Sequence, residues 1–134
     1  MATTRPRPYS QFNFLVDLGI EGGPHAGFQE LSQIKKITGL NKSADVTLKR
    51  GVISSSALQD WLTQIRKAPK RARRTVTVKL QDEQQRVANI WTLKSASIIK
   101  HAGPDLNAKG TDVAIEELVL SCERIDVKKG STNR

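Results

Sequence analysis

Short segments in which apolar and polar residues alternate recur along the chain, and this pattern limits its possible folds more than any other feature. Every second residue from Phe12 to Leu18 is apolar, and a period of two is typical of a strand with one buried face. The same alternation predicts a strand at residues 75–80, and Val46 and Leu48 share one face of a predicted strand at 45–50. A polar turn at residues 82–85 leads to a further strand near 87–94, which is expected to continue through 95–99. The sequence therefore predicts a mainly β domain.

One segment has the features of a helix instead. Ser56, followed three residues later by Gln59, forms a capping box that satisfies backbone donors of a first helical turn. Apolar residues then recur at the spacing of one helical face, at Leu58, Trp61, Leu62 and Ile65. Arg66 and Lys67 suit the negative end of the helix dipole, and Pro69 stops propagation. These signals predict a helix over about residues 56–67.

Two other segments are ambiguous from their residues alone. Between residues 28 and 40 an apolar residue recurs every three positions, which allows a helix, although the Gly22-Gly23-Pro24 turn favours a hairpin with the first strand. Between residues 112 and 127 one helical face is apolar and Asp112 is placed to cap it, yet the β-branched residues favour a strand. Helix and strand stay equally open for this last segment.

The length and composition suit a small domain with one core. The 134 residues predict a single domain spanning 1–134, with an aliphatic core because only 4% of the residues are aromatic. Residues 1–10, which contain Pro6 and Pro8, are predicted to form an extended arm, and residues 128–134 a free tail. No window holds the roughly 18 apolar residues of a membrane helix, and no apolar stretch follows Arg5 and Arg7. We expect synthesis in the cytosol and no membrane span.

No group of residues has the spacing of a catalytic, metal or nucleotide site. His25 and His101 lie near Gly-Pro pairs without a second ligand at metal-binding spacing. The serines at 54–56 lack the glycines of a nucleophile elbow, and no glycine-rich phosphate motif is present. Cys122, the single cysteine, is expected to pack as a small hydrophobe. The sequence therefore predicts a protein that is not an enzyme and holds no metal or cofactor.

The chain is strongly basic, with 22 Lys and Arg against 13 Asp and Glu and a formal charge of +9. Residues 66–74 hold six of these cations, namely Arg66, Lys67, Lys70, Arg71, Arg73 and Arg74. Such a cluster can neutralise phosphates, and its binding to nucleic acid would depend steeply on salt. No aromatic residues are interleaved to stack on bases, so a solvated loop or a docking face for an acidic protein is favoured. A small basic nucleic-acid-binding module that uses residues 66–74 is the alternative.

Ordered short motifs over residues 9–127 resemble those of the tail tube proteins of contractile phage tails and related injection systems. They are Phe12-Asn13-Phe14, the segment from Gly27 to Ser32, Leu48-Lys49-Arg50-Gly51, Trp61-Leu62, the segment from Thr75 to Glu83, Trp91-Thr92-Leu93, the segment from Gly103 to Ala108, and the segment from Val113 to Leu118. Each motif alone is weak, but the ordered set is specific.

The resemblance implies two packed antiparallel sheets in a barrel-like sandwich with one flanking helix. It also implies a closing strand at residues 114–120, which favours the strand over the helix for the last segment. In one respect the chain departs from the family pattern. Only residues 33–47 lie between the second and third motifs, where the family carries a longer hairpin toward the adjacent subunit, so we expect a shortened hairpin.

For function, the resemblance implies a structural subunit that forms hexameric rings, which stack into a hollow inner tube. The implied partners are sister copies, a contractile sheath, baseplate and tube-initiator proteins, and DNA or protein cargo in the lumen. The implied location is a virion tail or injection particle, after synthesis in the bacterial host cytoplasm. The motifs and the basic cluster supply these candidate residues for assembly or partner interfaces: Lys49, Arg50, Gly51, Lys67, Lys70, Arg71, Arg73, Arg74, Gly103, Asp105 and Asn107.

Overall fold

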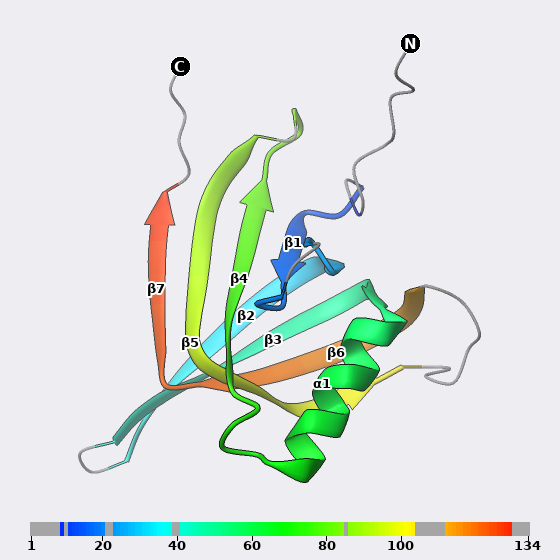
Figure 1. The fold of residues 1–134 in the computed structure, drawn as a ribbon. Coiled ribbons are helices and arrows are strands. Elements are labelled where there is room, and N and C mark those ends of the chain that lie inside the picture. Colours follow the sequence, from blue (N-terminus) through cyan, green and yellow to red (C-terminus); the bar gives the residue numbers. More distant parts are fainter. Residues whose placement is uncertain are drawn as a thin grey trace.

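The computed structural model describes residues 9, 11–20, 23–38, 41–84, 86–103 and 112–129 (Figure 1). Within these ranges, the elements in chain order are β1 (Phe14–Asp17), β2 (Ala26–Thr38), β3 (Asn41–Ser54), α1 (Ser55–Lys67), β4 (Arg74–Gln81), β5 (Val87–Ala102), β6 (Asp112–Cys122) and β7 (Arg124–Lys129). The predicted mainly β domain with one helix is confirmed.

Six of the strands close into one antiparallel barrel. Their order is β4-β1-β2-β3-β6-β5, and β5 pairs back with β4 to complete the ring. β7 lies outside this ring, because it pairs with the first part of β5, from Asn89 to Lys94, whereas β6 pairs with the second part, from Ser97 to Ala102. The barrel-like shape was predicted correctly. The prediction of two separate packed sheets was wrong, because a single sheet bends round and closes on itself.

The first bend lies where β2, β3 and β6 run side by side. Buried residues in β6 follow one another at intervals of two, except between Ile115 and Leu118, where the interval is three. On the paired strand β3, Arg50 has a φ of 57°, in the left-handed region. At the next residue, Gly51, an added Cβ would lie 2.0 Å from the carbonyl oxygen of Gly27 on β2. The Lys-Arg-Gly motif therefore marks a corner of the barrel at which two backbones approach too closely for any side chain.

A second bend lies in the middle of β5. Ser95 has a φ of 55°, and the buried residues on either side of it, Leu93 and Ala96, are three positions apart. Next to this bend the chain passes from β6 to β7, and the backbone N–H of Glu123 donates to the carbonyl of Lys94 at 2.9 Å. β5 stays paired with its neighbouring strands before and after the bend. The sheet therefore continues through the bend and does not divide into two sheets.

The helix α1 packs its apolar side against β3 and β5. Trp61 is fully buried, and its Nε1 donates to the carbonyl of Ala72 at 2.7 Å, which ties the helix to the loop before β4. The predicted helix is confirmed, but its cap was placed two residues too late. The cap is Ser54, whose Oγ accepts from the backbone N–H of Ala57 at 3.4 Å.

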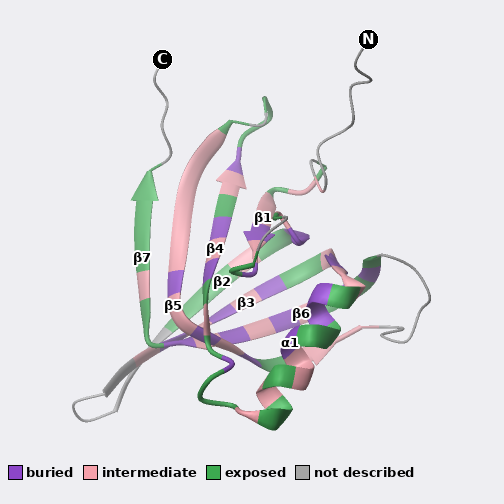
Figure 2. Cartoon of the chain, in the orientation of Figure 1, coloured by how far each residue is buried: buried purple, intermediate pink, exposed green. Residues whose placement is uncertain are grey.

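Both segments that were ambiguous in sequence are strands. Residues 28–38 belong to β2, which pairs with β3 in a hairpin, so the helical alternative there is wrong. Residues 112–127 form β6 and most of β7, which confirms the strand implied by the resemblance. The buried residues of β6 alternate with partly exposed and exposed ones along most of the strand (Figure 2).

Several predicted bounds also need correction. The first strand is shorter than predicted and covers only Phe14–Asp17. The predicted continuation of the strand at 87–94 through residues 95–99 is confirmed, because both segments belong to β5. β5 continues beyond residue 99 to Ala102, and Lys128 and Lys129 belong to β7, not to the predicted free tail. Of the predicted arm at 1–10, only Tyr9 lies within the described residues, and its Oη donates to Asp112 Oδ1 at 2.7 Å.

Candidate functional site

Charged residues from four strands form a ladder on the face of the sheet that points away from the core. Lys49 of β3 is paired in register with Glu30 of β2 on one side and with Glu117 of β6 on the other. The Lys100 Nζ of β5 lies 2.9 Å from Glu117 Oε1, and Arg50 Nε donates to Glu30 Oε2 at 2.9 Å. Opposite charges thus alternate across the strands, and such cross-strand pairs stabilise a sheet.

The ladder offsets the charges of two predicted interface residues, Lys49 and Arg50. The hydrogen bond from Lys100, helped by the positive charges of Lys100 and Lys49, lowers the pKa of Glu117 below its ordinary value. Arg50 forms an ion pair with Glu30. Both cations therefore have carboxylates near them within the chain, and this part of the surface is not a bare positive patch.

The basic segment, residues 66–74, runs from the end of α1 through a loop into β4. Arg74 is half-buried: its guanidinium lies over the Trp61 ring, 4.9 Å from the centroid, and donates to Gln64 Oε1 at 2.9 Å. Desolvation by this packing lowers the pKa of Arg74 from its ordinary value. Arg74 thus fixes the loop to the helix, whereas the other cations of the segment, Arg66, Lys67, Lys70, Arg71 and Arg73, are exposed.

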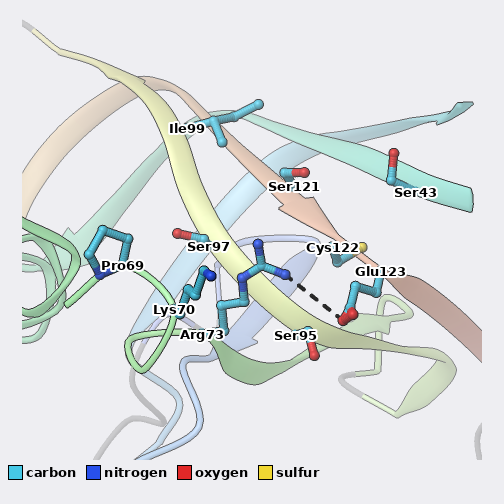
Figure 3. A pocket seen from close by; sticks show the side chains of 10 residues that line it. All are labelled: Ser43, Pro69, Lys70, Arg73, Ser95, Ser97, Ile99, Ser121, Cys122 and Glu123. Atoms are coloured by element: carbon cyan, nitrogen blue, oxygen red, sulfur yellow. Dashed lines mark ion pairs between the residues drawn. The ribbon is translucent and has the colours of Figure 1, made fainter. Parts of the chain in front are cut away.

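A concave pocket of about 300 Å³ lies beside this basic segment. The loop after α1 forms one wall with Pro69, Lys70 and Arg73, and strand residues form the rest (Figure 3). The strand residues are Ser43, Ser95, Ser97, Ile99, Ser121 and Cys122, and Glu123 lies between β6 and β7. The Nη1 of Arg73 lies 3.9 Å from Glu123 Oε2 across the pocket. Two cations, one carboxylate and four hydroxyls thus line a single recess.

Cys122 contributes to this pocket but remains a buried thiol. Its side chain is 2% exposed, and its Sγ lies 3.5 Å from the carbonyl oxygen of Ala44, to which it donates. Burial, together with the negative charge of Asp45, raises the pKa of Cys122 to about 11. A thiol that stays protonated at neutral pH is a poor nucleophile, so its packing matches the predicted small hydrophobe.

The structure distributes the predicted interface residues over separate places. Lys49, Arg50 and Gly51 lie at the barrel corner on β3, and no ion pair or hydrogen bond within the described ranges links them to the basic segment. Gly103 directly follows β5, while Asp105 and Asn107 lie outside the described residues. Sequence reasoning missed the serines and Glu123 of the pocket, because strands far apart in the chain bring them together and no local motif marks them.

The described residues were also compared with the requirements of a membrane-spanning helix and of a metal site. None of the helices there is long and apolar enough to cross a membrane. Nor do the described residues hold a group of three or more histidine, cysteine or carboxylate side chains arranged to bind a metal ion. His25 is buried, and its Nδ1 accepts from the backbone N–H of Leu18 at 3.1 Å.

The described residues form a closed antiparallel barrel with one helix and one further strand, which defines a β-barrel domain. The family described as "T4-like virus tail tube protein gp19" matches residues 32–126, which is most of the chain. The chain belongs to this family, and it is a structural component of a contractile-tail system, not an enzyme. A search of curated proteins found no significant match.

Solved structures with the same fold come from contractile injection systems. The anti-feeding prophage cap, or tube-terminating cap, has a TM-score of 0.53 at 19% identity, with 97% of this chain and 95% of that chain covered. The PVC sheath–tube complex in the extended state has a TM-score of 0.53 at 20% identity, covering 92% and 93%. The PVC sheath/tube terminator has a TM-score of 0.52 at 21% identity, covering 95% and 99%. These similarities support the fold over almost the whole chain.

Proposed function

We propose that the chain is the repeating subunit of an inner tube in a contractile tail or related injection particle. Six copies form a ring, and rings stack into a hollow conduit for DNA or protein cargo. The observation that carries the proposal is the family match across residues 32–126. The match includes most of the β2–β3 hairpin and the start of β7, and β2 and β7 are the strands whose edges the barrel leaves open.

Two strand edges support assembly from sister copies. β7 pairs with β5 along one edge, and no described strand pairs with the other. β2 pairs with β1 only from Ala26 to Phe28, so its outer edge from Gln29 to Thr38 has no described partner strand. Unpaired edges are sites at which another chain adds a strand, and a closed ring of identical subunits pairs them all.

The exposed cations of the basic segment suit contact with a surrounding sheath. We propose that they face an acidic inner surface of the sheath, and that baseplate and initiator proteins start the tube inside a virion tail or injection particle. Reversing the charge at Lys67 and Arg71, which are both exposed, is expected to weaken sheath attachment while rods still form. Unchanged sheath attachment in this double variant would remove the proposed role of the segment.

Negative-stain microscopy and light scattering of the purified protein test the proposed function. Hollow rods or stacked rings with a six-subunit repeat are expected. Single rings that never stack would point to a terminating cap instead of a tube subunit. A compact monomer at every concentration, even with baseplate components added, would refute the proposal. Dispersed particles that shift a nucleic-acid probe would favour the DNA-binding alternative.

A pair of proline variants tests the role of the β7 edge. Neighbouring residues of an antiparallel strand direct their N–H groups to opposite edges. Of Asp126→Pro and Val127→Pro, one therefore removes a donor to β5 and the other a donor on the open edge. We expect the variant that loses a donor to β5 to have a lower melting temperature. The variant that loses a donor on the open edge is expected to keep its fold but form no rods. Rods from the variant that keeps the wild-type melting temperature would exclude β7 as an assembly edge.

A further inference from the structure

The pocket beside the basic segment has hydrogen-bonding groups that the fold itself does not use. Ser95 and Ser97 lie on β5, Ser121 is paired in register with Ser97 on β6, and Ser43 comes from β3. Among the described residues, none of these hydroxyls has a hydrogen-bond partner. These partly exposed hydroxyls can therefore donate to a ligand that carries acceptor oxygens.

The two cations of the pocket have no strong ion pair among the described residues. Lys70 has no ion-pair partner within the described part of the chain, and Arg73 reaches Glu123 only at 3.9 Å, with both side chains about half exposed. An exposed pair at this separation contributes little. The recess carries two cations against one carboxylate, so a further carboxylate can enter without breaking an interaction on which the fold depends.

The rest of the pocket is apolar and small. Pro69 lies in the loop wall, and Ile99, a large apolar side chain that is 56% exposed, stands on β5 (Figure 3). A volume of about 300 Å³ is at the lower end of ligand sites and holds a few side chains, not a polymer backbone. No aromatic residue lines the pocket to stack on a base, which disfavours nucleic acid as its occupant.

We propose that this pocket binds an acidic segment of a partner protein, in which an aspartate or glutamate is next to an aliphatic residue. The carboxylate contacts Lys70 and Arg73 and accepts from the serine hydroxyls, and the aliphatic side chain packs on Pro69 and Ile99. This occupant uses the positive charge, the hydroxyls and the apolar wall together. The inference rests on the proposed function only in taking the partner to be another tail component.

Fluorescence anisotropy tests the proposal with a fluorescein-labelled six-residue peptide of alternating glutamate and leucine. We expect saturable binding at 0.15 M salt that Lys70→Glu or Arg73→Glu weakens about tenfold. Lys79→Glu is the matched control, because it makes the same charge change at an exposed site on β4, away from the pocket. The control is expected to stay within about twofold of the wild type, since distant exposed charges are screened.

A gain of affinity provides a second, independent readout. Glu123→Gln removes the one carboxylate of the pocket and leaves Arg73 free for the peptide, so we expect tighter binding by about threefold. Circular dichroism checks that each variant is folded. Equal losses in Lys79→Glu and Arg73→Glu, or no gain in Glu123→Gln, would overturn the proposal.

A competition experiment separates the two classes of polyanion. An unlabelled single-stranded oligonucleotide that displaces the peptide, and whose own binding depends on Lys70 and Arg73 in the same way, would assign the pocket to nucleic acid and overturn the proposal. Failure to displace the peptide supports it. Because peptide binding is measured whether or not rods form, loss of binding and loss of tube assembly are distinguishable results.

Discussion

Replacing Gly51 by alanine is expected to destabilise the barrel strongly at its first corner. An added Cβ would lie 2.0 Å from the Gly27 carbonyl oxygen and 2.6 Å from the ring of Phe28. A Cβ contact shorter than 3.0 Å is essentially never found in proteins, so about 1 Å of separation has to be gained. β2 must supply it, because the oxygen belongs to its backbone and Phe28 is fully buried.

The size of the effect follows from the rigidity of that strand. Overpacking a well-packed core costs about 1–3 kcal/mol, and we expect the upper end, about 3 kcal/mol, since β2 is paired with β3 at positions on both sides of the contact. For a chain of this size, each kcal/mol shifts the melting temperature by about 4 °C. The Gly51→Ala variant should therefore melt about 12 °C below the wild type.

Thermal unfolding followed by circular dichroism measures this shift, with both proteins at one concentration because assembly stabilises the folded state. Arg50→Gly is the control at the adjacent residue. It relieves a φ of 57°, which costs a non-glycine residue about 1–2 kcal/mol, but it loses the exposed ion pair with Glu30 and adds freedom to the unfolded chain. We expect its stability to stay within about 1 kcal/mol of the wild type. A Gly51→Ala variant as stable as Arg50→Gly would refute the steric argument.

Three further predictions concern the helix, the charge ladder and the buried thiol. Trp61→Phe should lower the free energy of unfolding by about 2 kcal/mol, because the Ala72 carbonyl loses its donor in a buried site; an unchanged urea midpoint would contradict this. Glu117→Gln should be less stable than the wild type at pH 7, and the difference should shrink as the pH falls below the ordinary pKa of a glutamate. Lys100 lowers the pKa of Glu117 in the folded state, so its contribution exists above the unfolded pKa and disappears as pH falls through the folded value; a pH-independent difference would exclude the ion pair as the cause. Cys122, with its pKa raised to about 11, should react with a thiol reagent at pH 8 only after unfolding, and stability should fall as pH rises above about 9; rapid reaction of the native protein would show that the thiol is accessible.

The helix and most strands were predictable because their patterns are local. The apolar stripe that includes Leu58 and Trp61 does become the buried side of α1, and the alternation at residues 75–80 becomes β4. The helix cap was misplaced because the three consecutive serines at 54–56 offer the same hydroxyl, and in the structure it is Ser54 that caps α1.

The ambiguous periodicity has a physical origin in the barrel. Ile115 and Leu118 are three residues apart and both point into the core, because the sheet bends between them and the alternation changes phase. The same bend gives the spacing of Phe28 and Leu31 on β2, which pair in register with Gly51 and Leu48. A bend in a sheet thus imitates one turn of helical spacing, and single-sequence periodicity cannot separate the two.

The sequence by itself determined the class of the protein. Strands with alternating apolar residues, one capped helix, an excess of positive charge and the ordered motifs indicated a structural tail protein. These signals come from residue types and their order along the chain, and none of them requires knowledge of which distant residues are in contact. The tertiary structure alone decided that the sheet closes into one barrel, that Lys49 and Arg50 face carboxylates, and that serines from three strands meet beside Arg73. These features depend on pairing between residues far apart in sequence, and strand register is fixed only when the whole core is packed.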